Sequence, residues 1–184
     1  MHKSLPVFSA VFMGFAFLIT PAVWSADQEE APLGLGRSAT DKDIQPWNID
    51  ISPDGQGLPP GQGSVKQGAQ IYAMKCAGCH GPTGREGPHD TLVGGHGSLQ
   101  TAKPRKTIGS YWPYATTVYD YLRRAMPFTA PQSLTPDELY ALVAWLLHQN
   151  GIVGEDSILD ARNLPRIDMP NRNGFIPDPR PDVP

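Results

Sequence analysis

The sequence predicts an all-α domain with few helices and long loops, flanked by an extended N-terminal arm and a polar C-terminal tail. First, apolar residues recur at helical spacing in three segments, residues 65–75, 115–125 and 136–149. Second, residues 27–64 and 151–184 are largely polar, contain many Gly, Pro and Asp residues, and have no apolar period. Third, the chain contains no internal repeat and no convincing strand.

Two of the predicted helices carry one apolar face each. In residues 65–75 this face consists of Val65, Ala69, Tyr72 and Ala73. In residues 115–125 it consists of Val118, Tyr121, Leu122 and Ala125. Side chains that recur every three or four residues lie on one side of a helix, so each face is expected to pack against a core. The first of these helices is expected to end at Cys76.

Residues 136–149 carry the clearest helical pattern, with suitable residues at both ends. Thr135 suits the N-cap, Pro136 suits the first helical position, and Glu138 completes a capping box. Asn150 and Gly151 then end the helix in the usual C-terminal manner. The expected buried face consists of Leu139, Leu142, Val143, Leu146 and Leu147, with Trp145 beside it.

Residues 1–26 are predicted to be a secretory signal that is cleaved on export. Lys3 supplies a basic start, an apolar stretch runs from Val7 to Ile19, and small residues follow around Ser25. The alternative is a transmembrane anchor, but the stretch is short for a hydrocarbon core of roughly 30 Å and is interrupted by polar residues, Gly and Pro. We therefore expect a periplasmic protein without stable membrane insertion.

The remaining chain has the length of one domain. Its expected parts are an arm at 27–64, a helical domain at 65–150 and a tail at 151–184. Residues 65–136 hold eight basic and three acidic residues, whereas the flanks are net acidic. Such a balance predicts a charged protein partner and no nucleic acid, with a solvated surface as the alternative. The densest basic residues are Lys103, Arg105, Lys106, Arg123 and Arg124.

The run Cys76-Ala77-Gly78-Cys79-His80 has the pattern of a c-type haem attachment site. Two cysteines at this spacing, at the entrance of a helix, can each form a thioether with one haem vinyl group. His80 follows directly and reaches the iron from the same side, as the proximal ligand. Because the chain has one such motif, we expect one covalently bound haem c.

Three other uses of the two cysteines fit the sequence less well. A zinc site needs a second pair of ligands, and no second C-x-x-C or H-x-x-x-H pattern exists. A thioredoxin-like dithiol belongs in a βαβ context, which the sequence lacks. A disulfide would leave His80 unexplained. The composition of residues 81–113 also favours a haem site, because a Gly- and Pro-rich loop of this length is expected where the chain wraps a cofactor.

The ligand on the other face of the iron decides the function, because a Met sulfur saturates the iron and favours electron transfer. Met126 is the predicted distal ligand, since it ends one helix and precedes Pro127 in the loop before the last helix. Met169 is the reserve ligand, and core packing is the alternative role of Met126. Less suitable candidates are Met74 on the proximal side, His148 within the last helix, and His89 and His96 in the loop after the motif.

These features together resemble a class I cytochrome c: a first helix, the C-x-x-C-H motif, a Met loop and a closing amphipathic helix with an aromatic residue. In that family a Gly on the first helix lets the last helix cross closely, and aromatic side chains fill the crossing. The matching positions are Gly68, Tyr72, Tyr140 and Trp145. The resemblance implies an all-α, class I cytochrome c-like haem domain with the arm and tail added to it.

Segments outside the haem core resemble the cytochrome subunit of Sox-type sulfite or sulfane dehydrogenases. These segments are residues 47–59, 108–115, 123–128 and 169–175. The resemblance implies a subunit that accepts electrons from a molybdenum-containing dehydrogenase subunit and passes them to another cytochrome. Both cysteines serve the haem, so no molybdenum ligand is available and no substrate chemistry is expected on this chain. Some members carry a second haem domain, whereas this chain has one motif.

Three alternatives remain open at this point. A peroxidase-like haem enzyme would need an open or His-ligated distal site. A stand-alone periplasmic carrier would serve a different dehydrogenase. A ligand sensor would usually carry a signalling domain, of which the sequence shows none. The spectrum of the oxidised protein separates electron transfer from the haem enzyme and the sensor, because a Met sulfur on ferric iron gives its own charge-transfer band.

Overall fold

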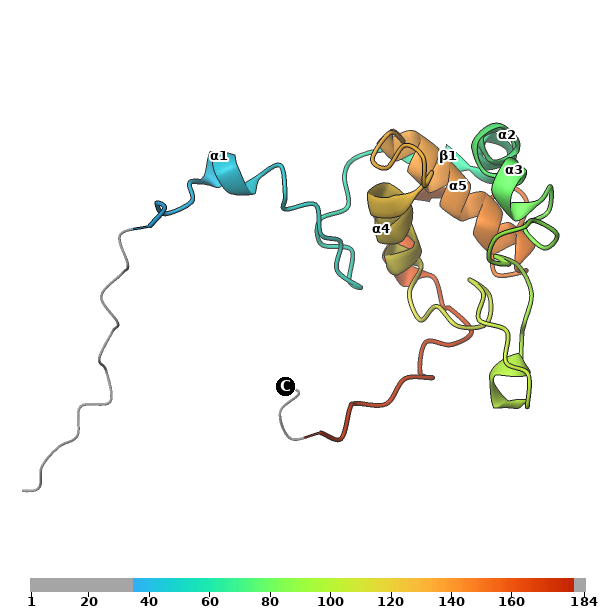
Figure 1. Ribbon diagram of the computed structural model, residues 1–184. Helices are drawn as coiled ribbons and strands as arrows, with labels where there is room; N and C mark the ends of the chain where they lie inside the picture. The colour runs from blue at the N-terminus through green and yellow to red at the C-terminus, as the bar shows by residue number, and fades with distance from the viewer. Residues whose placement is uncertain (1–34, 181–184) are drawn as a thin grey trace, which may run out of the picture. The chain divides into compact units, whose positions relative to one another are not determined.

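A computed structural model of the chain describes residues 35–180 (Figure 1). Residues 40–184 form one compact unit, and of the other unit, residues 1–39, only the last five are described. The predicted signal at residues 1–26 lies outside the described part. Within residues 35–180, no helix combines the length and the apolar composition that crossing a membrane requires.

The three predicted helices are present with the predicted bounds. They are α2 (Val65–Lys75), α4 (Ala115–Ala125) and α5 (Pro136–Gln149). Shorter elements complete the described chain: α1 (Asp41–Ile44), α3 (Ala77–His80), η1 (Ser98–Gln100) and η2 (Leu164–Arg166). Most of residues 81–114 is loop, as expected for a segment that surrounds a cofactor.

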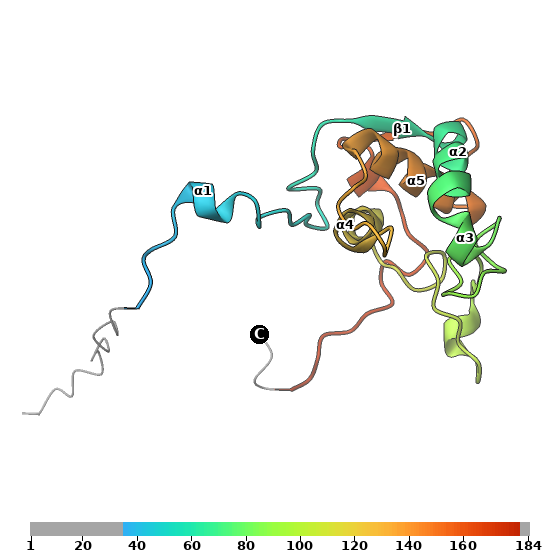
Figure 2. The ribbon, with the colours of Figure 1, turned by 45° about the horizontal axis from the view of Figure 1, so that its top comes forward.

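Helix α5 is the centre of the core. Its residues Leu139 to Leu147 are all buried, so the helix is covered on every side rather than on one face. Helices α2 and α4 and the strand β1 (Gln62–Ser64) lie around it (Figure 2). The predicted capping box is confirmed, since the Thr135 hydroxyl accepts from the backbone N–H of Glu138 and the Glu138 carboxylate accepts from that of Thr135.

Helices α2 and α5 cross at Gly68. A methyl group at this position would lie 1.9 Å from the carbonyl oxygen of Ala141, so only glycine allows the two backbones to approach this closely. Beside the crossing, the rings of Tyr72 and Trp145 stack with their centroids 3.9 Å apart. The crossing places the C-terminal end of α2, and with it Cys76, firmly against the core.

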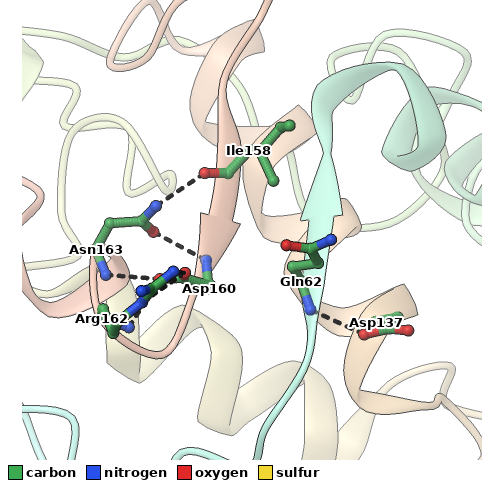
Figure 3. Close-up of polar contacts among 6 residues, drawn as sticks. All are labelled: Gln62, Asp137, Ile158, Asp160, Arg162 and Asn163. Atoms are coloured by element: carbon green, nitrogen blue, oxygen red, sulfur yellow. Dashed lines mark hydrogen bonds and ion pairs between the residues drawn. The ribbon is translucent and has the colours of Figure 1, made fainter.

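A short antiparallel strand pair differs from the expectation that the chain has no strands. β1 pairs with β2 (Ile158–Asp160), with Gly63 opposite Leu159. Both strands are three residues long, too short for an alternating pattern to be recognised in the sequence. Figure 3 shows how the ends are held: Gln62 N donates to Asp137 at the start of α5 (2.8 Å), and Asn163 Nδ2 donates to Ile158 O (2.9 Å).

The apolar face of α4 differs in part from the predicted stripe. Val118 and Leu122 are buried as expected, but Tyr121 is 47% exposed and Tyr119 is fully buried in its place. The Tyr119 ring packs on Tyr140 of α5, with 4.7 Å between the ring centroids. Helix α4 is therefore rotated about its own axis relative to the predicted orientation. Tyr121 instead contacts Trp112 edge to face.

The arm divides into a packed and an exposed part. Ile51 is buried in the core, and Pro59 O accepts from the Tyr140 hydroxyl (2.8 Å). The sequence pattern places Trp47, Ile49 and Ile51 on one face, yet Trp47 is 82% exposed. The reason is local: α1 and the turn after it, which ends at Trp47, break the extended conformation.

Candidate haem-binding site

The attachment motif lies at the junction of two helices. Cys76 ends α2 and precedes α3, which contains Cys79 and ends at His80. Both thiols are free; Cys76 is half-buried and Cys79 is exposed. Burial raises the pKa of the Cys76 thiol to about 11, although neighbouring Lys75 opposes the shift. One short segment therefore presents two thiols and an imidazole together.

The tautomer of His80 follows from its hydrogen bond. Its Nδ1 lies 2.9 Å from the backbone carbonyl oxygen of Asp90. A carbonyl can only accept, so Nδ1 carries a proton and Nε2 is the ring nitrogen left to bind a metal. Such a bond also fixes the ring orientation of a metal-ligating histidine. The hydrogen bond thus leaves Nε2 as the nitrogen that an axial iron ligand would use.

The loop after the motif is held close to it. Tyr72 is a buried residue of α2, and its hydroxyl donates to Gly81 O at 3.0 Å. A methyl group at Gly87 would lie 2.1 Å from Cys79 O, so the returning chain passes against the motif itself. The Thr83 hydroxyl hydrogen-bonds the Glu86 carboxylate, and this contact lowers the pKa of Glu86. These contacts position the carbonyl that orients His80.

Asn150 fastens the far side of the same loop, a role that the sequence did not reveal. Its Oδ1 accepts from Gly94 N at 2.9 Å, and its Nδ2 donates to Leu146 O at 2.8 Å and to Leu92 O at 3.3 Å. The side chain is buried, so every one of these bonds replaces water. The sequence indicated Asn150 only as the residue that ends α5.

The structure places the candidate distal ligands in different surroundings. Met126 follows α4 directly, is half-buried, and its backbone N–H donates to Leu122 O at 3.2 Å. Met169 is 2% exposed and belongs to the core, whereas Met74 is 75% exposed on α2. Of the histidines, His89 is tied to the motif through its backbone, His96 is exposed, and His148 Nδ1 lies 3.2 Å from Val153 O.

The residues present fit a haem. A planar apolar macrocycle needs an apolar lining, and half-buried side chains of this kind border the core: Cys76, Ala77, Leu92, Trp112 and Met126. The donor set is an imidazole whose Nε2 is left to bind a metal and a thioether sulfur, together with two thiols for attachment. Haem supplies one-electron redox chemistry when it is bound. Among residues 35–180, no three His, Cys, Asp or Glu side chains gather as a zinc site would need.

Comparisons with known proteins show the family of this chain. Residues 63–146 match a protein-family model described as cytochrome C oxidase, cbb3-type, subunit III. A chain of the crystal structure of the sulfane dehydrogenase SoxCD from Paracoccus pantotrophus is 47% identical, with a TM-score of 0.75. The match covers 82% of this chain and 74% of that one. The chain belongs to the c-type cytochrome family. No curated protein sequence matches it.

The family confirms the class I cytochrome c-like fold and the expected haem c, and it makes this protein an electron-transfer cytochrome. The attachment to Cys76 and Cys79 and the iron ligands His80 and Met126 remain predictions for this chain. The SoxCD match covers 82% of the chain, whereas the helical domain at residues 65–150 makes up less than half of it. The similarity therefore extends into the arm or the tail.

The five basic residues that are densest in the sequence fall into two groups. Arg123 and Arg124 are half-buried and already have partners, Ile49 O and the carboxylates of Asp50 and Asp120. The charge of Arg124 is therefore met by carboxylates of the same chain, whereas Arg123 bonds a neutral carbonyl and keeps its charge. Lys103 and Arg105 are exposed, and their side chains contact no charged partner within residues 35–180. Lys106 lies beside them, with its Nζ 5.0 Å from the centre of the Tyr111 ring.

Proposed function

We propose that this cytochrome carries one haem c, bound covalently through Cys76 and Cys79 and ligated by His80 and Met126. The free Nε2 of His80 and the half-buried position of Met126 after α4 support the ligand pair. The deep burial of Met169 in the core speaks for a packing role of that residue instead. A six-coordinate iron with a Met ligand favours electron transfer over peroxide chemistry.

We further propose that the cytochrome is the periplasmic electron-transfer subunit of a sulfur dehydrogenase. It would accept electrons from a molybdenum-containing subunit that oxidises sulfite or a sulfane sulfur, and pass them to another cytochrome. The observation that carries this proposal is the 47% identity to a chain of SoxCD over 82% of the sequence. The motif uses both cysteines, so the sulfur chemistry belongs to a partner chain.

Lys103, Arg105 and Lys106 are exposed, and we call them the basic loop. Their positive charge supports the proposal that the cytochrome docks to an acidic partner. Complementary charge mainly accelerates encounter between redox partners, and salt screens this effect. Arg124 is ion-paired with Asp50 and Asp120, whereas Lys103, Arg105 and Lys106 are exposed, so the basic loop is available to meet an acidic surface of a redox partner.

The test is reduction of the purified cytochrome by the molybdenum-containing subunit of a sulfane dehydrogenase. In stopped flow, addition of sulfite or of a protein-bound sulfane should reduce the haem within catalytic turnover. Substitution of Lys103 and Arg105 by Glu should slow this step at low ionic strength and have little effect at high ionic strength. If neither sulfur substrate reduced the haem, and peroxide rapidly oxidised the reduced haem, the haem enzyme would be favoured instead.

A further inference from the structure

Residues 49–53 of the arm run along α4 in the opposite direction, and α4 leads directly to Met126. Pro53 O accepts from the Thr116 hydroxyl at 3.2 Å, near the start of α4. Ile51 N donates to Asp120 Oδ1 at 3.2 Å, about one turn further along the helix. Ile49 O accepts from Arg123 Nη1 at 3.2 Å, in the last turn. Figures 1 and 2 show this part of the arm beside α4.

The contacts are densest at the C-terminal end of the helix. Arg124 Nε donates to Asp120 Oδ2 at 2.8 Å, and its Nη2 forms an ion pair with Asp50 of the arm. The two oxygens of Asp120 thus connect the Ile51 backbone to Arg124. We call Asp50, Asp120, Arg123 and Arg124 the arm clamp. Each hydrogen bond of the guanidinium raises the pKa of Arg124, so the group stays charged.

The end of α4 has little other support. Leu122 is its last buried residue, whereas Arg123, Ala125 and Met126 are half-buried. The backbone N–H of Met126 bonds to Leu122 O, so the position of Met126 depends on whether this final turn is formed. Terminal turns fray when packing does not hold them.

We propose that the arm clamp positions Met126 as the distal ligand, so that the arm controls how firmly the sulfur stays on the iron. Asp50 and Arg124 are positioning residues, because they act through the helix end and not on the haem. This inference rests on the proposed ligand Met126 and adds a means by which a partner bound to the arm would alter the redox centre.

The test uses the oxidised holo-cytochrome and two readouts, the sulfur-to-iron charge-transfer band and the rate at which imidazole replaces the distal ligand. Asp50→Asn should raise that rate roughly 2–5-fold, the effect of weakening one exposed ion pair. Arg124→Ala should raise it further, on the order of 10-fold, because it removes both ion pairs of the clamp and leaves Asp120 without a cationic partner. Arg124→Lys should restore part of the effect.

Asp54→Asn is the matched control, since this carboxylate lies on the same arm but, among residues 35–180, bonds only to the backbone N–H of Gln56 (3.0 Å). Its imidazole rate should equal that of the wild type. The double variant Asp50→Asn/Arg124→Ala should be no faster than Arg124→Ala, because the two residues act as one unit.

Two failures have different meanings. If the wild type shows the band but neither Asp50→Asn nor Arg124→Ala changes it or the imidazole rate, the arm clamp does not position Met126. If Met126→Ala keeps the band of the wild type, the proposed distal ligand is wrong, and the role of the clamp is overturned with it.

Discussion

At the residue scale, replacing Met126 and Met169 by alanine should have different effects, the first on the haem iron and the second on stability. Met126 is half-buried at the border of the core, whereas Met169 is among the most deeply buried side chains. Met126→Ala should therefore keep the covalent haem, lower the reduction potential and open the iron to carbon monoxide or cyanide. Visible spectroscopy and redox titration of the purified variant measure both effects.

Met169→Ala is the control for this prediction. Loss of a buried Met side chain should lower the free energy of unfolding by about 2–5 kcal/mol and leave the spectrum unchanged. If Met169→Ala opened the iron while Met126→Ala left it closed, the assignment of the two methionines would be reversed, and haem attachment at Cys76 and Cys79 would be unaffected.

At the element scale, the crossing of α2 and α5 depends on one missing side chain. Gly68→Ala places a methyl group 1.9 Å from Ala141 O and 2.7 Å from Trp145 Cβ, and both contacts belong to a rigid helix. The helices must separate, and overpacking of this kind costs about 1–3 kcal/mol or more. Chemical denaturation of the holo-protein should show this loss.

Gly154→Ala is the matched control for the crossing. A methyl group there meets only Ser157 Oγ at 3.9 Å, an ordinary contact. Its free energy of unfolding should stay within about 0.5 kcal/mol of the wild type, as for most surface substitutions. Equal losses for the two variants would mean that close approach of the helices is not what Gly68 provides.

A second link between α2 and α5 predicts a pH dependence. Lys75 Nζ donates to Glu138 Oε1 at 2.6 Å, and this bond, with the backbone N–H of Thr135, lowers the pKa of Glu138. A carboxyl whose pKa is lower in the folded state stabilises the protein above its unfolded pKa, about 4.3, and loses this contribution as the pH falls through the folded value. The pair is partly exposed, so about 1 kcal/mol or less is expected.

Glu138→Gln should thus be less stable than the wild type at pH 7, and the difference should disappear near pH 3. Glutamine keeps an oxygen that can accept from the Thr135 backbone, so the capping box survives and the variant isolates the charge. Denaturation curves of both proteins at the two pH values provide the measurement. A difference of equal size at pH 7 and pH 3 would show that the ionised pair contributes nothing.

The elements also show how far the sequence predicts this fold. Helix α5 was predictable to the residue because its period and both of its ends are local properties of the chain. The strand pair was not, since three residues carry no period and the partners lie almost 100 residues apart. The buried face of α4 was only partly predictable, because the contact of Tyr119 with Tyr140 is tertiary and overrides the local pattern.

At the scale of the whole molecule, the predicted attachment residues lie together because they are consecutive, whereas their supporting contacts are distant in sequence. Asp90 O orients His80 through the backbone, so no residue type at position 90 could have indicated it. The side chain of Asn150 bonds to Gly94 and Leu92 in the loop after the motif, which lie 56 and 58 residues earlier in the sequence. Charge counts also do not show that Arg124 is ion-paired with Asp50 and Asp120, or that Arg123 bonds the Ile49 carbonyl of the arm.

The arm provides the last prediction, since its packed and exposed parts should have separable roles. Residues 49–61 contribute a core side chain, Ile51, and hydrogen bonds to α4 and α5. Trp47 and Ile44 are exposed, at 82% and 47%, and bury little against their own domain. Exposed aromatic side chains are frequent anchors in protein interfaces. We therefore expect the exposed part to bind the dehydrogenase subunit and the packed part to stabilise the cytochrome.

Two truncations of the exported protein test this division, one that lacks residues 27–48 and one that lacks residues 27–60. The shorter deletion should keep the melting temperature of the wild type and lose co-purification with the dehydrogenase subunit. The longer deletion should also lower the melting temperature, because it removes Ile51 and the contacts to Asp120 and Arg123. Trp47→Ala serves as the point variant and should weaken the complex without changing the melting temperature. If the shorter deletion still co-purified at wild-type yield, the exposed part of the arm would have no role in docking.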